Sequence, residues 1–369
     1  MEKRIPFYKT SIDGGIIDLN YNFKMGSPID RLEKEVNNTF NLSNSLSLGS
    51  SSAAMHLAMC ALDLKRGDKV ICPVNSFVDI PESVRHFDSE PIFVDIDPKR
   101  YTILTDELER TIIANKSKKL RAVVVTHFAG LAANIDEIKD IAKKHNLAVI
   151  EDATDSLGLE INGRYAGSIG DIGVYSFEYK LCRYISGGLL ATSNEEYFER
   201  AKLLSNHALI YENEDIYYLY DIKDIGCDYR MSELNSIICY ESFKKFRDNI
   251  KRRREIAAIY RRELDGVAHI TLPVEDKDHI YHYFIIEIDK NRDAFARELK
   301  KRGVEVGLHY VPLHLTKYYK EKYNLKIFDF PNALHIFQKT MSLPIYPLMS
   351  NDDVLYVCEA IKEVAKHHI

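Results

Sequence analysis

The chain has 369 residues, of which 46% are hydrophobic and 28% charged, a composition typical of a folded, water-soluble protein with one large and one smaller domain. Its formal charge of -5 argues against a general affinity for nucleic acids or membrane surfaces, so small molecules are the expected partners. The start has no apolar signal segment, no stretch is apolar enough to span a bilayer, and the six cysteines form no CxxC or metal-ligand pattern. We therefore expect a cytoplasmic protein that holds no metal.

The first half of the chain alternates between predicted helices and strands. After an arm-like stretch over residues 1–26, a helix begins at Pro28 with Ser27 as its N-cap. The segments KVICPV, EPIFVDID, KLRAVVVT and LAVI are short apolar runs typical of buried strands, and NIDEIKDIAKKHN predicts a helix with isoleucines on one face. This order implies an α/β fold with a large, mostly parallel sheet, in which ligands bind at the carboxyl ends of the strands.

Small hydroxyl residues, Ser50, Ser51 and Ser52, precede the predicted helix AAMHLAMCALD. A helix N-terminus with free amides and hydroxyls binds anions, although capping of the helix by one serine explains the same residues. Phe77 follows the next strand, in a loop where it either joins the core or forms a platform for an aromatic ring.

The stretch from 147 to 188 holds the residues around which we expect a site to form. Glu151 and Asp152 end a buried strand, and Lys180 stands between a second short strand and the pair Gly187-Gly188. Pyridoxal phosphate chemistry needs a carboxylate that keeps the pyridine nitrogen protonated and an amine that carries the cofactor as a Schiff base. By itself this pair is not specific, because many strands end in Asp and surface lysines are common.

The second half of the chain is more helical. A loop rich in acids and tyrosines, YENEDIYYLYDIKDIG, precedes two helices, and the KRRR run in the second is typical of a solvated helix face. We place a domain boundary at this second helix. It separates a large cofactor-binding domain with its N-terminal arm, residues 1–245, from a smaller α+β domain, residues 246–369.

Taken in order along nearly the whole chain, several motifs resemble the DegT-type sugar aminotransferases: SSSAAMHLAMCALDLKRGDKVICPV, EDATDSLG, GSIGDIGVYSF, YRMSEL, HIYHYFII and GLHYVPLH. The resemblance implies fold type I of the pyridoxal phosphate enzymes and a reaction on nucleotide-linked keto sugars. It also implies a homodimer whose two active sites share residues across the interface. Several such motifs in one order are far more specific than any one alone.

The resemblance implies a role for each matching residue. Lys180 would carry the cofactor and shuttle the proton during the reaction, Asp152 would pair with the pyridine nitrogen, and Phe77 would stack on the ring. Ser51, Ser52 and Ser176 would contact the phosphate, as would Asp228 from across the dimer interface. Asp155 would lie beside the ring, and His309 and Tyr310 match a substrate-side segment.

Some features depart from the family pattern. The segment from Ser176 to Lys180 is one residue shorter, Asp155 stands where Gln or His is common, and Ile185-Ser186 replaces a glycine and an acid. Asp228 stands where the family has an asparagine that reaches the phosphate. The negative phosphate would repel the Asp228 carboxylate. Arg183 stands where the family has a small hydroxyl residue. It either pairs with Asp228 and still offers donors to the phosphate, or points to solvent while Asp228 contacts the phosphate through water.

Three functions fit these residues. The first is an aminotransferase that takes its amino group from glutamate and delivers it to a nucleotide-linked keto sugar. The second is a sugar dehydratase of the same fold, although that branch has histidine at the position of Lys180. The third is a catalytically degenerate member that binds a ligand without chemistry, for which the shortened segment before Lys180 and the acid Asp228 are the support.

Overall fold

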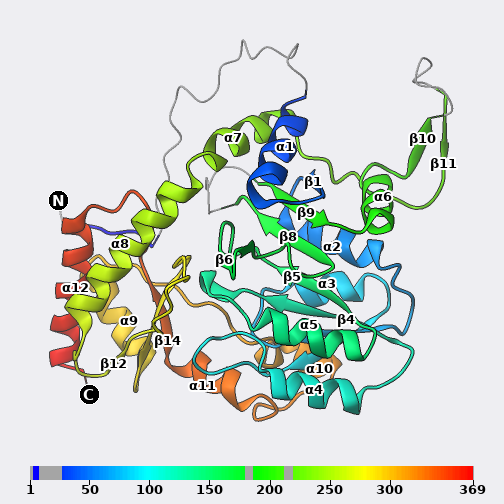
Figure 1. Cartoon of the computed structure of the whole chain (residues 1–369). Coiled ribbons are helices and arrows are strands. Elements are labelled where there is room, and N and C mark those ends of the chain that lie inside the picture. Colours follow the sequence, from blue (N-terminus) through cyan, green and yellow to red (C-terminus); the bar gives the residue numbers. More distant parts are fainter. Residues whose placement is uncertain (1–2, 8–26, 179–185, 212–218, 369) are drawn as a thin grey trace.

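A computed structural model describes residues 3–7, 27–178, 186–211 and 219–368. A seven-stranded sheet forms the centre of the molecule (Figure 1), with the strand order β1-β9-β8-β5-β4-β2-β3. Its strands are β1 (Asn44–Leu48), β2 (Lys69–Pro73), β3 (Glu90–Val94), β4 (Leu120–Thr126), β5 (Ala148–Asp152), β8 (Ile172–Ser176) and β9 (Gly188–Thr192). The five strands from β3 to β8 run parallel; β9 pairs antiparallel with β8, and β1 pairs antiparallel with β9, so β9 alone in this sheet runs against the others. The predicted α/β class with a large, mostly parallel sheet is therefore confirmed.

Helices cover both faces of this sheet because its strands are apolar on both sides. One face packs against α1 (Pro28–Phe40), α4 (Thr105–Ala114), α5 (Ile135–Lys144) and α7 (Glu233–Phe243). The other packs against α2 (Ser51–Ala61), α3 (Asp79–Arg85) and α6 (Glu195–Leu204). The helix predicted from Pro28 begins there, and the Ser27 hydroxyl accepts the Ile29 N–H at 3.2 Å, as expected of an N-cap.

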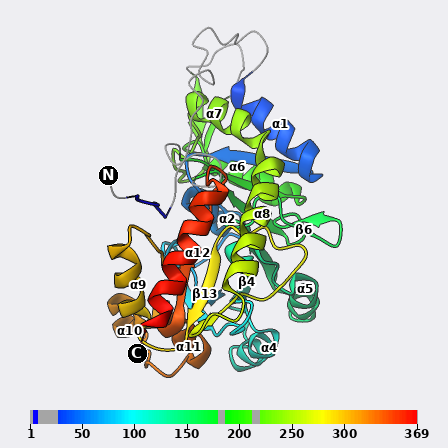
Figure 2. The same cartoon turned by 90° about the vertical axis from the view of Figure 1, so that its left-hand side faces the viewer.

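A second core forms around a three-stranded antiparallel sheet of β12 (Ile270–Thr271), β13 (Phe284–Ile288) and β14 (Thr340–Leu343). The long helix α8 (Phe246–Leu264) runs from the large sheet to this one (Figure 1), and α12 (Asn351–Lys366) packs against α8 and α9 (Arg292–Lys301) (Figure 2). The division of the chain into domains at residues 245 and 246 stays a prediction, although α8 begins at that position.

Short elements complete the described chain. They are the helices α10 (Lys317–Lys322) and α11 (Pro331–Lys339), the 3-10 turns Phe128–Gly130 and Leu313–Leu315, and the hairpins β6–β7 (Glu160–Ile161, Arg164–Tyr165) and β10–β11 (Leu209–Tyr211, Tyr220–Ile222). Among the described residues, no helix is both long and apolar enough to cross a membrane.

The loop after β4 links the two sheets. Gly130 has a φ of +83°, and a Cβ there would lie 2.5 Å from the Ile280 side chain and 3.0 Å from the His282 backbone nitrogen. The close approach allows two backbone hydrogen bonds, from Ile280 N–H to the Gly130 carbonyl and from His282 N–H to the Ala129 carbonyl. Only glycine tolerates this conformation together with this contact, so the THFAG motif fixes how the segment just before β13 meets the large sheet.

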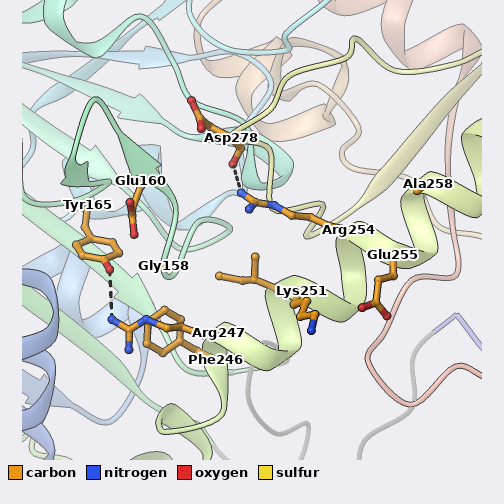
Figure 3. Close-up of a pocket in the computed structure, with 11 residues that line it drawn as sticks. Gly158, Glu160, Tyr165, Phe246, Arg247, Lys251, Arg254, Glu255, Ala258 and Asp278 are labelled. Carbon is orange, nitrogen blue, oxygen red and sulfur yellow. Dashed lines mark hydrogen bonds between the residues drawn. The ribbon is translucent and has the colours of Figure 1, made fainter.

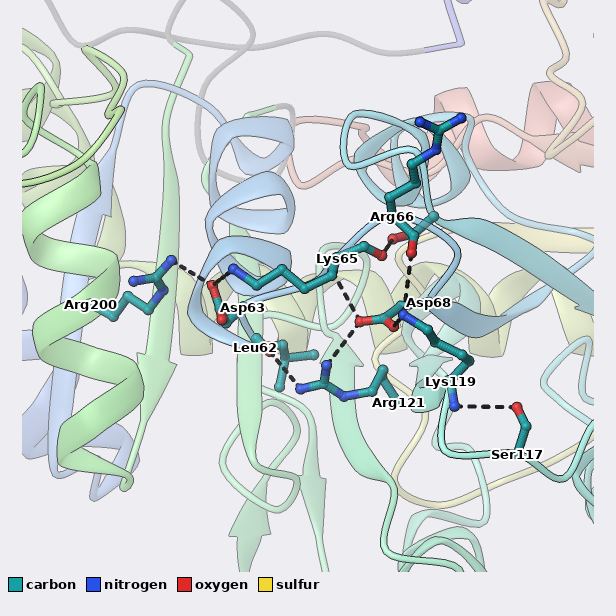
Figure 4. A network of polar contacts seen from close by, with 10 residues as sticks. Leu62, Asp63, Lys65, Arg66, Asp68, Ser117, Lys119, Arg121 and Arg200 are labelled. Carbon is teal, nitrogen blue, oxygen red and sulfur yellow. Dashed lines mark hydrogen bonds and ion pairs between the residues drawn. The ribbon is translucent and has the colours of Figure 1, made fainter.

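Cations surround the C-terminal end of α2, at the amino edge of the sheet (Figure 4). Arg121 donates to the Leu62 carbonyl at 3.0 Å and Arg200 donates to the Cys60 carbonyl at 2.9 Å. Arg121 also pairs with the buried carboxylate of Asp68, as Lys119 does. These contacts satisfy the last carbonyls of α2 and favour its dipole. The opposite end of α2, with its unpaired amides, points to the carboxyl edge of the sheet.

Candidate active site

Asp152 ends β5 at the carboxyl edge of the sheet, and only 5% of it is exposed. Thr126, which ends β4, donates its hydroxyl to Asp152 Oδ2 at 3.0 Å. Thr154 donates its hydroxyl and its backbone N–H to Oδ1 at 2.5 and 3.1 Å. Hydrogen bonds of this kind stabilise the charged form of a carboxylate. Asp152 is therefore suited to bind a cationic group of a ligand.

The neighbouring acid, Glu151, points to the other side of β5, because successive side chains of a strand alternate. It is fully buried, accepts a hydrogen bond from His127 Nε2 at 2.8 Å, and accepts three backbone N–H groups of the 167–170 turn. Burial raises the pKa of Glu151, but the His127 hydrogen bond and these amides outweigh it, so the pKa lies below its usual value. Of the two acids, Glu151 holds the fold and Asp152 faces the candidate site.

The N-terminus of α2 lies beside β9. The Ser50 hydroxyl caps the helix by accepting an N–H of the first turn at 3.1 Å, and the Ser51 and Ser52 amides have no partner within the helix. A Cβ at Gly188 would lie 2.4 Å from the Ser50 carbonyl oxygen and 2.5 Å from the Ser51 nitrogen. Gly188 pairs in turn with Ser176 of β8. The structure thus brings the three serines predicted to contact phosphate to one end of the site, where their roles stay predictions.

Asp79 is a further acid at this end, two residues after Phe77. Its Oδ2 lies 3.1 Å from Ser52 Oγ. Burial raises the pKa of the Asp79 carboxyl to about 7, and the negative charge of Asp152 acts in the same direction. Asp79 is not among the residues predicted from the sequence, and its only sequence signal is its place two residues after Phe77.

Phe77 is 53% exposed, which excludes the alternative that it belongs to the core. Its ring centroid lies 5.7 Å from that of Tyr310, with the planes tilted by 55°. The Tyr310 N–H donates to Asn75 Oδ1 at 3.4 Å, its ring meets Phe128 edge-on, and burial raises its pKa far above the usual value. A cavity of about 590 Å³ opens beside these two rings, between α3 and α10. Phe77 is thus placed to receive a flat ring.

The other predicted ring-side and substrate-side residues lie near the same junction. Asp155 is buried, and His282 Nε2 lies 3.6 Å from its Oδ1, so the pair joins the large domain to the segment just before β13. His309 stacks on Tyr283 with a centroid distance of 3.7 Å, and its Nδ1 lies 2.8 Å from Ser342 Oγ. Of the two predicted substrate-side residues, Tyr310 is the one that meets Phe77. His282 is another residue that the sequence analysis missed.

Lys180 and Arg183 lie outside the described residues, as do the last two residues of the segment from 176 to 180 that is predicted to be one residue short, so these predictions stand as they were. Asp228 is half exposed, and its two oxygens accept hydrogen bonds from Arg230 at 2.8 and 3.0 Å. The Arg230 guanidinium holds the pKa of Asp228 below its usual range. A cation in the same loop therefore already pairs with Asp228, a possibility that the sequence analysis did not consider beside Arg183.

The donors at this edge fit pyridoxal phosphate. The buried carboxylate of Asp152 suits a protonated pyridine nitrogen, the open face of Phe77 suits the ring, and the amides and hydroxyls at the α2 N-terminus suit a phosphate. Among the described residues that the α2 N-terminus contacts, the acid Asp79 has the wrong charge for a phosphate. Within the described residues, no group of three or more His, Cys, Asp or Glu side chains is arranged to hold a metal.

A second groove, of about 600 Å³, lies between α8 and the β6–β7 hairpin (Figure 3). There Tyr165 of the hairpin accepts a hydrogen bond from Arg247 at 3.4 Å, and Arg254 donates to the Asp278 carbonyl at 3.0 Å. None of the predicted site residues lines this groove. It is separate from the candidate site.

The family model described as "DegT/DnrJ/EryC1/StrS aminotransferase family" matches residues 17–362. Among curated relatives, the chain is 30% identical to the spore coat polysaccharide biosynthesis protein SpsC of Bacillus subtilis, with 92% of this chain and 90% of that protein covered. It is 27% identical to GDP-perosamine synthase of Escherichia coli O157:H7, with 98% of each chain covered. A solved structure titled as a putative sugar aminotransferase from Streptococcus pneumoniae superimposes with a TM-score of 0.91 at 20% identity, and the match covers 99% of this chain and 100% of that one. This similarity confirms the predicted fold.

Proposed function

Because the chain belongs to the DegT/DnrJ/EryC1/StrS aminotransferase family, we propose that it transfers an amino group, with glutamate as donor, to a keto group of a nucleotide-linked sugar. Membership confirms the predicted family and enzyme class, and with them pyridoxal phosphate as the cofactor that aminotransferase chemistry uses. The nucleotide, the donor and the roles of individual residues belong to the proposal.

One observation carries the proposal, namely that the buried carboxyl group of Asp152 shares the edge of the sheet with the open ring of Phe77 and the N-terminus of α2. When bound, pyridoxal phosphate supplies an electron sink for the transfer of the amino group. Asp152 would pair with the protonated pyridine nitrogen, and hydrogen bonds from Thr126 and Thr154 fix the orientation of its carboxyl group. Phe77 would orient the ring, and Lys180 would move the proton between donor, cofactor and acceptor.

The names of the relatives support a sugar as the amino acceptor. One is named a synthase of GDP-perosamine, a nucleotide-linked sugar, and the other is named for polysaccharide biosynthesis. The cavity of about 590 Å³ beside Phe77 and Tyr310 has the size of a small-molecule site and opens next to the proposed cofactor ring. Both supports agree with a keto sugar bound in the cavity beside Phe77 and Tyr310.

The β10–β11 hairpin supports a homodimer with shared sites. It extends from the body of the molecule (Figure 1), and apolar residues on and beside it are exposed: Ile210, Tyr211, Leu219, Tyr220, Ile222 and Ile225. Exposed apolar residues gathered in this way are typical of a protein interface. Asp228 follows the hairpin in the chain. If a second subunit covers the hairpin, Asp228 of the first subunit would lie near the active site of the second.

The five cysteines in the described part of the chain are free, which agrees with a reducing compartment such as the cytoplasm. The dehydratase alternative is disfavoured by Lys180, where that branch has histidine. The degenerate alternative draws on the acids at the phosphate end, Asp79 and Asp228, although Arg230 pairs with the second of them.

The proposal is tested with the purified full-length chain and a panel of nucleotide-linked keto sugars, with glutamate as donor. We expect a visible absorption band that borohydride bleaches, and amino sugar formed in step with 2-oxoglutarate. Asp152→Asn should keep the cofactor but lose most of the transfer rate, because an unprotonated pyridine is a poor electron sink. Bound cofactor without transfer from any donor to any sugar would favour the degenerate alternative. Sugar conversion without an amino donor would favour the dehydratase.

A further inference from the structure

We propose that Asp79, in its protonated form, positions the Ser52 hydroxyl for the cofactor phosphate and makes phosphate binding at this site dependent on pH. This inference rests on the proposed function. It concerns a side chain that the resemblance to the family did not assign, and Asp79 acts through Ser52, so it is a positioning residue.

Two elements bring these side chains together. Asp79 is the first residue of α3 and Ser52 is the second residue of α2, and both helices cover the same face of the large sheet. Their Oδ2 and Oγ atoms are 3.1 Å apart. The hydroxyl predicted to face phosphate is therefore already hydrogen-bonded to a carboxyl group, at the helix end where an anion would bind.

The direction of that hydrogen bond depends on the charge of Asp79. A serine hydroxyl has one hydrogen, and an ionised carboxylate only accepts hydrogen bonds. When Asp79 is ionised, the hydrogen bond between them exists only if Ser52 donates to Asp79, and that hydrogen is then not available to phosphate. When Asp79 is protonated, it donates to Ser52 Oγ, and the Ser52 hydrogen is released toward the phosphate.

The charges around Asp79 favour the protonated form near neutral pH. Burial raises the pKa of Asp79 to about 7, the charges of Asp152 and Glu82 raise it as well, and hydrogen bonds from Ser52 and the Ile80 N–H lower it. A bound phosphate adds negative charge at the α2 N-terminus and favours protonation further. By linkage, affinity for the phosphate is highest below pH 7 and falls as Asp79 ionises. For each unit by which bound phosphate raises the pKa of Asp79, the affinity falls about tenfold between the protonated and the ionised form of Asp79.

A simpler role for Asp79 is to stabilise the start of α3 through the Ile80 N–H and the helix dipole. That role predicts a loss of thermal stability in every Asp79 variant. It predicts no change in how phosphate affinity depends on pH, so the two roles separate in one measurement.

The experiment measures binding of pyridoxamine 5'-phosphate to the full chain between pH 6 and 8.5. This probe forms no Schiff base with a lysine, and pyridoxamine without phosphate is the matched ligand control. In Asp79→Asn the amide can donate to Ser52 at every pH, so this variant is the reference. As the pH rises from 6 to 8.5, the ratio of wild-type affinity to Asp79→Asn affinity should fall about tenfold or more. Ser52→Ala should lose the part of this dependence that passes through its hydroxyl, and it keeps the test available if Asp79→Asn is unstable. An unchanged dependence in Ser52→Ala would overturn the positioning role, because Asp79 would then act on the phosphate directly.

Parallel pH profiles for wild type, Asp79→Asn and Ser52→Ala would overturn the inference while leaving the proposed function intact. The same pH dependence with pyridoxamine would also overturn it, because the effect would then not concern phosphate. Failure of wild type to bind pyridoxamine 5'-phosphate at any pH is a different result, since it would remove the proposed function and this inference with it.

Discussion

The contact between β9 and the N-terminus of α2 gives a sharp test of the phosphate end. In Gly188→Ala the new Cβ would lie 2.4 Å from the Ser50 carbonyl oxygen and 2.5 Å from the Ser51 nitrogen, both backbone atoms that cannot rotate away. The start of α2 must move, at a cost of about 1–3 kcal/mol in the free energy of unfolding, typical of overpacking. Hydrogen bonds from its amides to a charged phosphate are worth about 1.5–3 kcal/mol each, so losing one lowers affinity about tenfold to hundredfold.

The adjacent glycine is the matched control. A Cβ at Gly187 would first meet the terminal methyl of Met231 at 2.9 Å, and such a flexible end can move aside. Urea unfolding gives the two stabilities, and titration with pyridoxamine 5'-phosphate gives the two affinities. We expect Gly187→Ala to remain close to wild type and Gly188→Ala to lose affinity. Equal affinities for the two variants would show that the α2 N-terminus does not hold the phosphate.

Three further predictions concern the carboxyl edge of the sheet. Lys180→Ala should fold as wild type but lack the visible band of a lysine-bound cofactor, and mass spectrometry after borohydride reduction that found the cofactor on another lysine would contradict this. Glu151→Gln should lower the free energy of unfolding at pH 7 by about 3–5 kcal/mol, as for a broken buried pair. Because the pKa of Glu151 in the folded protein lies below its usual 4.5, the difference between wild type and variant should shrink as the pH falls below that value. A difference that does not change with pH would refute this prediction. Two double-mutant cycles combine Asp228→Asn with Arg230→Ala and with Arg183→Ala, and both measure cofactor affinity. The arginine that neutralises Asp228 should show a coupling energy of about 0.5–3 kcal/mol with it. Additive effects in both cycles would show that neither arginine neutralises Asp228.

The sequence predicted the sheet well because its signals are local. Short apolar runs bounded by turns identify buried strands, and their alternation with helices restricts the connections to a parallel sheet. The same alternation along β5 explains why Asp152, and not Glu151, faces the candidate site, although the sequence alone named both as acids at a strand end. Which of two adjacent acids serves the site depends on the faces of the sheet, which no local pattern gives.

Residues that act through contacts between distant segments were harder to find. Asp79 meets Ser52 from a different helix, and His282 meets Asp155 from the segment just before β13. Asp79 lies in none of the quoted motifs, and His282 lies in HIYHYFII, which by itself assigns no role to this histidine. Burial and partner geometry, which make such residues important, exist only in the folded chain.

Asp228 shows how a departure from a family pattern can be compensated locally. Read by itself, a carboxylate in place of an asparagine near phosphate suggests a damaged site. Its bidentate pair with Arg230, two residues along the same loop, reduces the repulsion that a phosphate would feel and leaves the loop near neutral. Within the described residues Asp79 forms no such ion pair, and its raised pKa points to protonation as the way in which its charge is removed. If Asp228 reaches the phosphate as proposed, the two acids would be tolerated by different means, one by an ion pair and the other by a proton. Only the second should make cofactor binding depend on pH near neutrality.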